Sequence, residues 1–465
     1  MQSKTQSSNI FWAALLLLTV IGIVPAQTPT PAKAPTAEQA AQSGGDKRGT
    51  PQAAIPTPKQ SQPTNNGELT QIYGLQGVLI ETLDGKTVSA QAADQAFNPA
   101  SSIKLATALV AIQTFGAQHR FATALWTDGS FDKANGKILG NLYVTGRDPS
   151  FHYEHAVMVA RQLNSLGIRT VTGDLVIAPG FTMNFNSSAR RSGEILYETL
   201  DATLRSGEAT RSWTYERTTL GDPSSLQTVP SVIVMGTVRV GSVMAAASLL
   251  LTHNSSKLTD VLKVLLCYSN NFMAERIGDN LGGTESVRQH LINTLAIPPG
   301  EIKLASLSGL GINRVTPRAM MRIFRELRKE LQKNKLSPAE IMPVAGVDPG
   351  TLEDRFTGPA WQGSVIAKTG TLIRTDGGAS SLVGQMRTAK GETLLFVIMN
   401  QRGNVGRFRE NQDYLVMQVQ NSRGGPKAFE YRPMALTMKL ANSEDTAGSA
   451  NNEYEPNGKS NTSSP

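Results

Sequence analysis

Residues 98–104 read Asn-Pro-Ala-Ser-Ser-Ile-Lys and precede an apolar run with the spacing of an amphipathic helix. Asn98 is a good helix N-cap, and Pro99 suits the first helical position because an N–H group would have no partner there. We therefore expect Ser101 in the first turn, where free backbone N–H groups favour developing negative charge. Lys104 follows three residues later, on the same face as the Ser101 hydroxyl.

This spacing is compatible with a serine nucleophile and a lysine base. A serine attacks poorly until a base removes its proton, and a lysine can do so only where burial or a nearby cation lowers its pKa. The pattern alone is weak evidence, because an ordinary capped helix can contain it. Ser130 and Lys133 repeat the spacing in a polar turn without a helix start, and we expect them at the surface.

A second polar group, Ser269-Asn270-Asn271, follows the apolar helix predicted over residues 258–267. More helix is predicted over 272–277, so the group is expected at a break between two helices. It offers a hydroxyl and a carboxamide, although an isolated Ser-x-Asn is more often a capped helix junction.

A third group, Lys368-Thr369-Gly370-Thr371, ends a strand predicted over residues 364–367. The glycine would let a substrate backbone approach, and the lysine would supply a fixed cation. An ordinary strand leading into a turn remains the alternative for this segment taken alone.

The pattern around these groups predicts a mixed α/β fold with an antiparallel sheet and flanking helices. Asp84-Gly85 predicts a hairpin turn between strands over 78–82 and 87–90. Three more strands are predicted over 364–367, 381–386 and 393–399, and a final helix over 408–419. The first and last segments thus belong to one domain, and residues 138–239 are predicted to be an insertion.

The three groups in this order resemble the motif set of β-lactamases and penicillin-binding proteins. The chain is similar in more detail to the class C low-molecular-mass penicillin-binding proteins, the D-alanyl-D-alanine carboxypeptidase/endopeptidase family. Further resemblances are Gly140-Asn141-Leu142-Tyr143-Val144, Asp148-Pro149-Ser150, Ser269 to Glu275, and Ser308-Gly309-Leu310 with Arg314-Val315-Thr316-Pro317. The match is weakest from 182 to 239, and Ser306-Leu307 replaces the family's usual Asp-Gly.

The resemblance implies a serine-type D,D-peptidase. Ser101 would form the acyl-enzyme with Lys104 as general base, Ser269 would relay the proton, Asn271 would bind the substrate peptide, and Lys368 would polarise the relay. Thr369, Gly370 and Thr371 would bind the substrate, with the backbone N–H groups of Ser101 and Thr371 as oxyanion hole. The implied partners are peptidoglycan stem peptides, with β-lactams as covalent inhibitors; neither nucleic acid, a metal nor another cofactor is implied.

The domain boundaries follow from composition and this resemblance. We predict a signal peptide over 1–26, a disordered linker over 27–67, the peptidase domain over 68–137 and 240–422, a reduced, mostly-β insertion over 138–239, and a disordered tail over 423–465. The apolar run from 10 to 24 with small residues after it indicates export to the periplasm or cell envelope, with a retained anchor as the alternative.

The composition excludes some classes of protein but does not identify a binding partner. The 465 residues, 40% hydrophobic and 18% charged, exclude a wholly disordered or fibrous protein. Cys267 is the single cysteine, so an internal disulfide is excluded. The net charge of +8 is spread without a dense cluster. His152 and His155 can share a helical face, but without a third ligand in view we do not predict a metal site there.

Two alternatives to the peptidase remain open at this stage. A β-lactamase or esterase can use the same scaffold, but we find no Glu-x-x-x-Asn motif between the first two groups to activate a deacylating water. A catalytically silent wall-binding protein is suggested by Ser306-Leu307 and the reduced insertion.

Overall fold

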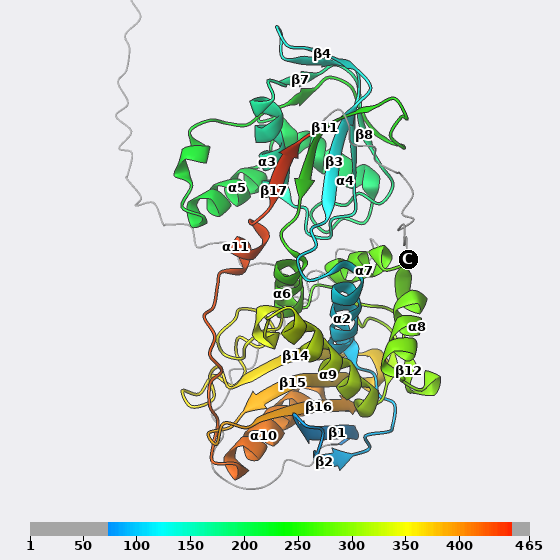
Figure 1. Cartoon of the computed structure of the whole chain (residues 1–465), viewed down its shortest axis with the longest axis vertical. Helices are drawn as coiled ribbons and strands as arrows, with labels where there is room; N and C mark the ends of the chain where they lie inside the picture. The colour runs from blue at the N-terminus through cyan, green and yellow to red at the C-terminus, as the bar shows by residue number, and fades with distance from the viewer. Residues whose placement is uncertain (1–72, 449–465) are drawn as a thin grey trace, which may run out of the picture. The chain divides into compact units, whose positions relative to one another are not determined.

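The computed structural model describes residues 73–448, which form two large β-sheets with associated helices (Figure 1). The predicted signal peptide and the predicted linker lie outside the described residues. Within residues 73–448, no helix is both long and apolar enough to cross a membrane. The predicted fold class, a mixed α/β fold with an antiparallel sheet flanked by helices, is confirmed.

The first sheet has five antiparallel strands in the order β14-β15-β16-β1-β2. The predicted hairpin forms between β1 and β2, and the three later strands are present, although the first continues beyond its predicted end at residue 367 to Leu372. Because β1 pairs with β16, the two ends of the predicted peptidase domain meet in one sheet. The bounds are β1 (Leu75–Thr82), β2 (Thr87–Gln91), β14 (Val365–Leu372), β15 (Ala379–Arg387) and β16 (Thr393–Gln401).

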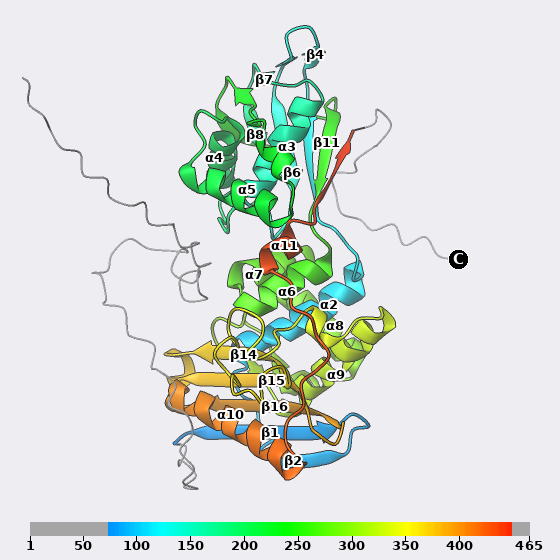
Figure 2. The same cartoon turned by 90° about the vertical axis from the view of Figure 1, so that its left-hand side faces the viewer.

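Alternate residues of β16 belong to two different hydrophobic clusters, as the side-chain period of a strand requires. One cluster holds Leu395, Val397 and Met399 with apolar residues of α2 and α9. The other holds Leu394, Phe396 and Ile398 with Val416 of α10. Helices therefore cover both faces of the sheet (Figure 2). These helices are α2 (Lys104–Phe115), α9 (Pro317–Lys333) and α10 (Val405–Ser422).

The helix predicted at Asn98 forms with a modified start. The Asn98 side chain accepts a hydrogen bond from the Ala100 N–H at 3.0 Å, and the first turn is a 3-10 helix, η1 (Ala100–Ile103), that leads into α2. Helices α6, α7 and α8 and a two-stranded sheet complete this part of the fold. Their bounds are α6 (Leu258–Tyr268), α7 (Asn271–Asn280), α8 (Gly283–Leu295), β12 (Ile302–Lys303) and β13 (Arg314–Val315).

The second large sheet has six strands in the order β10-β8-β6-β3-β11-β17, and β10, β8 and β6 run parallel. A four-stranded sheet accompanies it in the order β4-β5-β7-β9. The bounds are β3 (Ala122–Thr127), β4 (Ser130–Asp132), β5 (Lys137–Leu139), β6 (Leu142–Gly146), β7 (Thr170–Val171), β8 (Leu175–Ile177), β9 (Ile233–Val234), β10 (Val238–Val240) and β11 (Ser248–Asn254).

The inserted region differs from the prediction in two respects. It contains three helices of twelve or thirteen residues, α3 (Tyr153–Ser165), α4 (Ala189–Leu200) and α5 (Gly207–Thr219), so it is not mostly β. Its sheet also includes β3 and β11, which lie outside residues 138–239. Parallel strands need long crossover connections, and helices commonly provide them. The division into domains itself stays a prediction.

The prediction of a disordered tail from residue 423 is wrong for residues 423–448. This segment forms α11 (Leu436–Leu440) and β17 (Glu444–Ala447), and β17 pairs antiparallel with β11. Figure 1 shows β17 beside β11, although the two strands are far apart in sequence. The rest of the predicted tail lies outside the described residues.

Candidate active site

Ser101 and Lys104 lie side by side where η1 joins α2. The Lys104 Nζ donates to the Ser101 Oγ at 2.9 Å, and its side chain is fully buried. Ala100 has φ +46°, a left-handed conformation that is costly for a residue with a Cβ. The strained turn comes directly before Ser101. The structure therefore pairs the predicted nucleophile with the predicted base.

Asn271 belongs to the same group, and Ser269 lies two residues before it. The Lys104 Nζ donates to the Asn271 Oδ1 at 2.7 Å. Ser269 ends α6 with φ +56°, and the Asn270 side chain caps α7, so the predicted helix break is present. Ser269 is buried, but in the described structure its hydroxyl makes no hydrogen bond to Ser101, Lys104 or Lys368. The proton relay through Ser269 stays a prediction.

Gly370 brings β14 against the turn that precedes Ser101. A Cβ at Gly370 would lie 2.5 Å from the Pro99 carbonyl oxygen, 3.0 Å from the Ala100 Cβ and 2.2 Å from the Ser381 Oγ. Only a glycine allows this approach. The predicted Lys-Thr-Gly strand and the predicted Ser-x-x-Lys helix are thus in direct contact.

Two buried lysines shape the electrostatics of the site. Burial lowers the pKa of Lys104 well below its usual value, and the positive charge of Lys368 lowers it further, while Glu275 opposes the shift. Burial also lowers the pKa of Lys368 to about 7. A lowered pKa makes the neutral, proton-accepting form of Lys104 easier to reach.

Thr369 and Thr371 lie on β14 beside these lysines. The Lys368 Nζ donates to the Thr369 carbonyl at 2.8 Å. Arg409 of α10 donates from Nη2 to the Thr371 Oγ1 at 2.8 Å. Arg409 could not be predicted from the sequence, because it lies 38 residues from Thr371 and only the fold brings α10 to the end of β14.

The loop at Ser308-Gly309 also contributes to the site, although its role was not predicted from the sequence. The Ser308 carbonyl accepts from the Ser101 Oγ at 3.2 Å and also from the Lys104 Nζ. Gly309 has φ +92°, and a Cβ there would lie 2.1 Å from the Ala100 carbonyl oxygen. In the sequence, the glycine of the family-like Ser-Gly-Leu segment was the feature that could have indicated this close approach.

The remaining sequence candidates lie apart from this group. Ser130 belongs to strand β4 and is exposed, as predicted for the surface copy of the Ser-x-x-Lys pattern. Cys267 is fully buried, and burial raises the pKa of its thiol to about 12, which leaves it protonated and unreactive at neutral pH.

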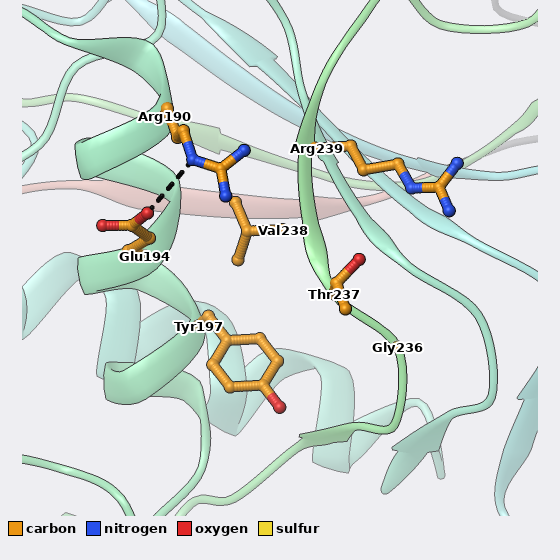
Figure 3. A pocket seen from close by; sticks show the side chains of 7 residues that line it. All are labelled: Arg190, Glu194, Tyr197, Gly236, Thr237, Val238 and Arg239. Carbon is orange, nitrogen blue, oxygen red and sulfur yellow. Dashed lines mark ion pairs between the residues drawn. The ribbon is translucent and has the colours of Figure 1, made fainter.

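A cavity of about 580 Å³ lies between α4 and β10 in the inserted region. Figure 3 shows its lining, with Arg190 paired to Glu194 on α4 and Arg239 on the opposite strand. Tyr197 completes the wall from the helix side. None of the predicted site residues lines this cavity, so it is separate from the paired serine and lysine.

Glu154, His155 and Glu216 place possible ligand atoms within 4.8 Å of one another. However, His155 Nδ1 accepts from the His152 N–H at 3.0 Å, and His155 Nε2 lies 3.1 Å from the Leu440 carbonyl. The ring therefore caps α3 on one side and binds α11 on the other. With both ring nitrogens engaged, we assign this group a structural role.

A family model, the D-Ala-D-Ala carboxypeptidase 3 (S13) family, matches residues 65–187 and 228–421, which is more than half of the chain. The chain belongs to this family. It is therefore a serine peptidase, as the motifs and their resemblance predicted. The gap in the match, residues 188–227, covers α4 and α5 and falls within the stretch where the predicted resemblance was weakest.

Known proteins agree with this membership. A D-alanyl-D-alanine carboxypeptidase from Actinomadura sp. (strain R39) is 25% identical over 422 residues, covering 70% of this chain and 77% of the relative. A carboxypeptidase from Mycobacterium tuberculosis is 25% identical over 417 residues, covering 82% and 87%.

Solved structures share the fold. A predatory peptidoglycan endopeptidase from Bdellovibrio bacteriovorus superposes with a TM-score of 0.66 at 21% identity, covering 81% of this chain and 100% of that one. Penicillin-binding protein 4 from Haemophilus influenzae superposes with a TM-score of 0.55 at 22% identity, covering 74% of this chain and 96% of that one.

Proposed function

We propose that this serine peptidase cleaves D-Ala-D-Ala bonds in peptidoglycan stem peptides through an acyl-enzyme on Ser101. The observation that supports this most directly is the fully buried Lys104 Nζ at 2.9 Å from the Ser101 Oγ. Neutral Lys104 would take the hydroxyl proton as the Ser101 Oγ attacks the carbonyl of the penultimate D-Ala. Family membership supports the choice of bond.

The reaction would proceed in two steps. In the first, the Oγ–C bond forms, the C–N bond breaks and Ser269 relays a proton to the leaving amine, with Lys368 polarising the relay. In the second, water attacks the ester, giving the shortened peptide and free Ser101. Asn271, Thr369, Gly370 and Thr371 would hold the peptide, and the Ser101 and Thr371 N–H groups would stabilise the oxyanion.

β-Lactams would acylate the same serine, because their strained amide presents an equivalent carbonyl to Ser101. The site needs no metal or organic cofactor for this chemistry. A family that acts on the cell wall works outside the cytoplasm, and we propose the periplasm or cell envelope as the location. Carboxypeptidase and endopeptidase activities both fit the group of residues described above.

Mass spectrometry after incubation with benzylpenicillin tests the proposal. We expect one covalent adduct, mapped to Ser101 and absent in Ser101→Ala. Ser130→Ala is the matched control, because it removes the surface copy of the motif, and it should be labelled normally. Labelling of Ser101→Ala would disprove the assignment of the nucleophile. A folded wild-type protein without an adduct would favour the silent wall-binding alternative, and rapid nitrocefin turnover would favour a β-lactamase.

A further inference from the structure

We propose that Glu275 is a positioning residue for acylation: its carboxylate holds the Ser308 peptide so that the Ser308 carbonyl faces both Ser101 and Lys104. This inference rests on the proposed role of Ser101 and Lys104. It assigns a role to a residue that contacts the loop rather than the reacting atoms.

The first step is the contact between α7 and the loop. The Glu275 Oε1 accepts from the Ser308 N–H at 2.8 Å, and its Oε2 lies 3.5 Å from the Leu307 nitrogen. A hydrogen bond to a carboxylate is stronger than one between neutral groups. The carboxylate therefore fixes the direction in which the Leu307–Ser308 peptide points its N–H group.

Close packing holds the same loop on the same face of α7. Gly278 lies three residues after Glu275, on the same side of the helix. A Cβ at Gly278 would lie 2.3 Å from the Leu307 Cδ1, so the loop approaches α7 where the helix has no side chain. Thr107 of α2 donates to the Leu307 carbonyl at 3.0 Å from the other side. The loop is thus held between α7 and α2.

The second step leads from the loop to the reacting groups. The Ser308 carbonyl accepts from both the Lys104 Nζ and the Ser101 Oγ. Ser308 and Lys104 are fully buried, so water does not replace this acceptor easily. If the Ser308 N–H were released, the Ser308 carbonyl could turn away. Ser101 and Lys104 would then lose the hydrogen-bond acceptor that they share.

The charge of Glu275 acts in addition to its hydrogen bond. The charged groups that influence Lys104 are Lys368 on β14, which lowers its pKa, and Glu275 on α7, which raises it. Asn271 and Ser308 contribute neutral acceptors. Removing the negative charge would favour neutral Lys104, so the acid limb of the acylation profile would move to lower pH.

The experiment compares Glu275→Ala and Glu275→Gln by the second-order rate constant for acylation with a fluorescent penicillin between about pH 5 and pH 9. We expect Glu275→Ala to acylate about 10- to 100-fold more slowly, because small misplacements of reacting groups have effects of this size. Gln keeps an acceptor oxygen, so Glu275→Gln should stay within about threefold of wild type at the plateau, while its acid limb moves down by about half a pH unit or more.

Glu285→Gln on α8 is the matched control, because Glu285 is exposed and its partner is Arg288. This variant should behave as wild type throughout. Wild-type rates in Glu275→Ala, or an unmoved acid limb in Glu275→Gln, would overturn the positioning role. If Glu275→Ala does not fold, the near-isosteric Gln variant still decides the question through its pH profile. Failure of the proposed function is distinguishable, because the wild-type protein itself would then not be acylated at Ser101.

Discussion

The five-stranded sheet and the six-stranded sheet of this protein are built differently. All pairs in the first are antiparallel, and both faces are covered by helices with separate hydrophobic clusters. The second mixes parallel and antiparallel pairs and collects strands from three separate parts of the chain. Every predicted site residue belongs to the first sheet or to the helices packed near it.

The difference between the two regions is clearest at two buried lysines. Near the first sheet, Lys104 and Lys368 are fully buried, and burial lowers the pKa of both. Other buried ionisable groups lie beside a partner. Near the second sheet, His253 Nδ1 is 2.7 Å from Asp445 Oδ1, and beside α6, Lys263 Nζ is 2.6 Å from Asp348 Oδ2. Ionisable groups with strongly shifted pKa values are typical of catalytic sites, whereas buried groups beside a partner are more typical of structural contacts. The following predictions test this distinction.

The largest effect is expected for Lys104→Met. The variant keeps the volume of the side chain but removes the base, so acylation by benzylpenicillin should fall by about 10²- to 10⁴-fold. The measurement is the rate of adduct formation by mass spectrometry. Lys133→Met, which changes the surface copy of the motif, should leave the rate unchanged. Normal acylation of Lys104→Met would contradict the role of Lys104 as the base.

Gly370→Ala should have the next largest effect. Its Cβ would lie 2.2–3.0 Å from Ser381, Pro99 and Ala100, so we expect a loss of stability of about 1–3 kcal/mol and slower acylation. Directly after β10 of the second sheet, the Cβ of Gly241→Ala would meet Val176 at an ordinary 3.4 Å, and this variant should change neither quantity. Urea unfolding measures the stability, and the rate of adduct formation measures acylation. Equal tolerance at both glycines would contradict the close approach of β14 to Ser101.

Asp445→Ala should reduce stability without impairing acylation. The change leaves His253 buried without its partner, at a cost of about 1–3 kcal/mol. Unfolding can be followed by intrinsic tryptophan fluorescence. Glu444→Ala is the control at the neighbouring position. The Glu444 side chain is exposed, so its ion pair with Arg120 should contribute about 1 kcal/mol or less. A loss of acylation in a folded Asp445→Ala variant would contradict the purely structural role of this contact.

Stability should also rise with pH through the buried lysines. Because the folded pKa of Lys368 is about 7 and its usual value is 10.5, the unfolded state binds more protons between these values. The free energy of unfolding should therefore increase from pH 7 to pH 8.5, by up to about 1 kcal/mol per pH unit. Lys368→Met should flatten this slope, and a residual slope should remain from Lys104. An unchanged slope in the variant would exclude a buried cation at this position.

The smallest effect is expected for Arg190→Ala at the cavity of the inserted region. The ion pair with Glu194 is exposed, so its loss should cost about 0.5 kcal/mol or less. Acylation by benzylpenicillin should match wild type, because the cavity contains none of the predicted site residues. A rate reduced tenfold or more would show that the two regions are coupled.

Much of the first sheet was predictable because its signals are local. The Asp84-Gly85 turn gives the hairpin of β1 and β2, and the apolar run of β16 reads as a strand without any tertiary information. The Ser-x-x-Lys spacing on a helix start similarly places Ser101 beside Lys104. In each case the residues that interact are close in sequence, so their pattern predicts the contact.

The second sheet was less predictable because its signals are not local. β17 has the sequence Glu-Asp-Thr-Ala, with little apolar surface, and its place depends on backbone pairing with β11 and on the contact of Asp445 with His253. A short polar strand at a sheet edge has the composition of a disordered tail. The prediction of disorder failed for this reason.

The sequence alone determined the family, the hairpin, the helix start and the three groups with catalytic chemistry. Each of these features depends on residues that are only a few positions apart. Only the tertiary structure brought Glu275 to the Ser308 peptide, Arg409 to Thr371 and Gly370 to the turn before Ser101. These contacts join segments tens to hundreds of residues apart, and their geometry depends on how the buried faces of helices and strands pack together.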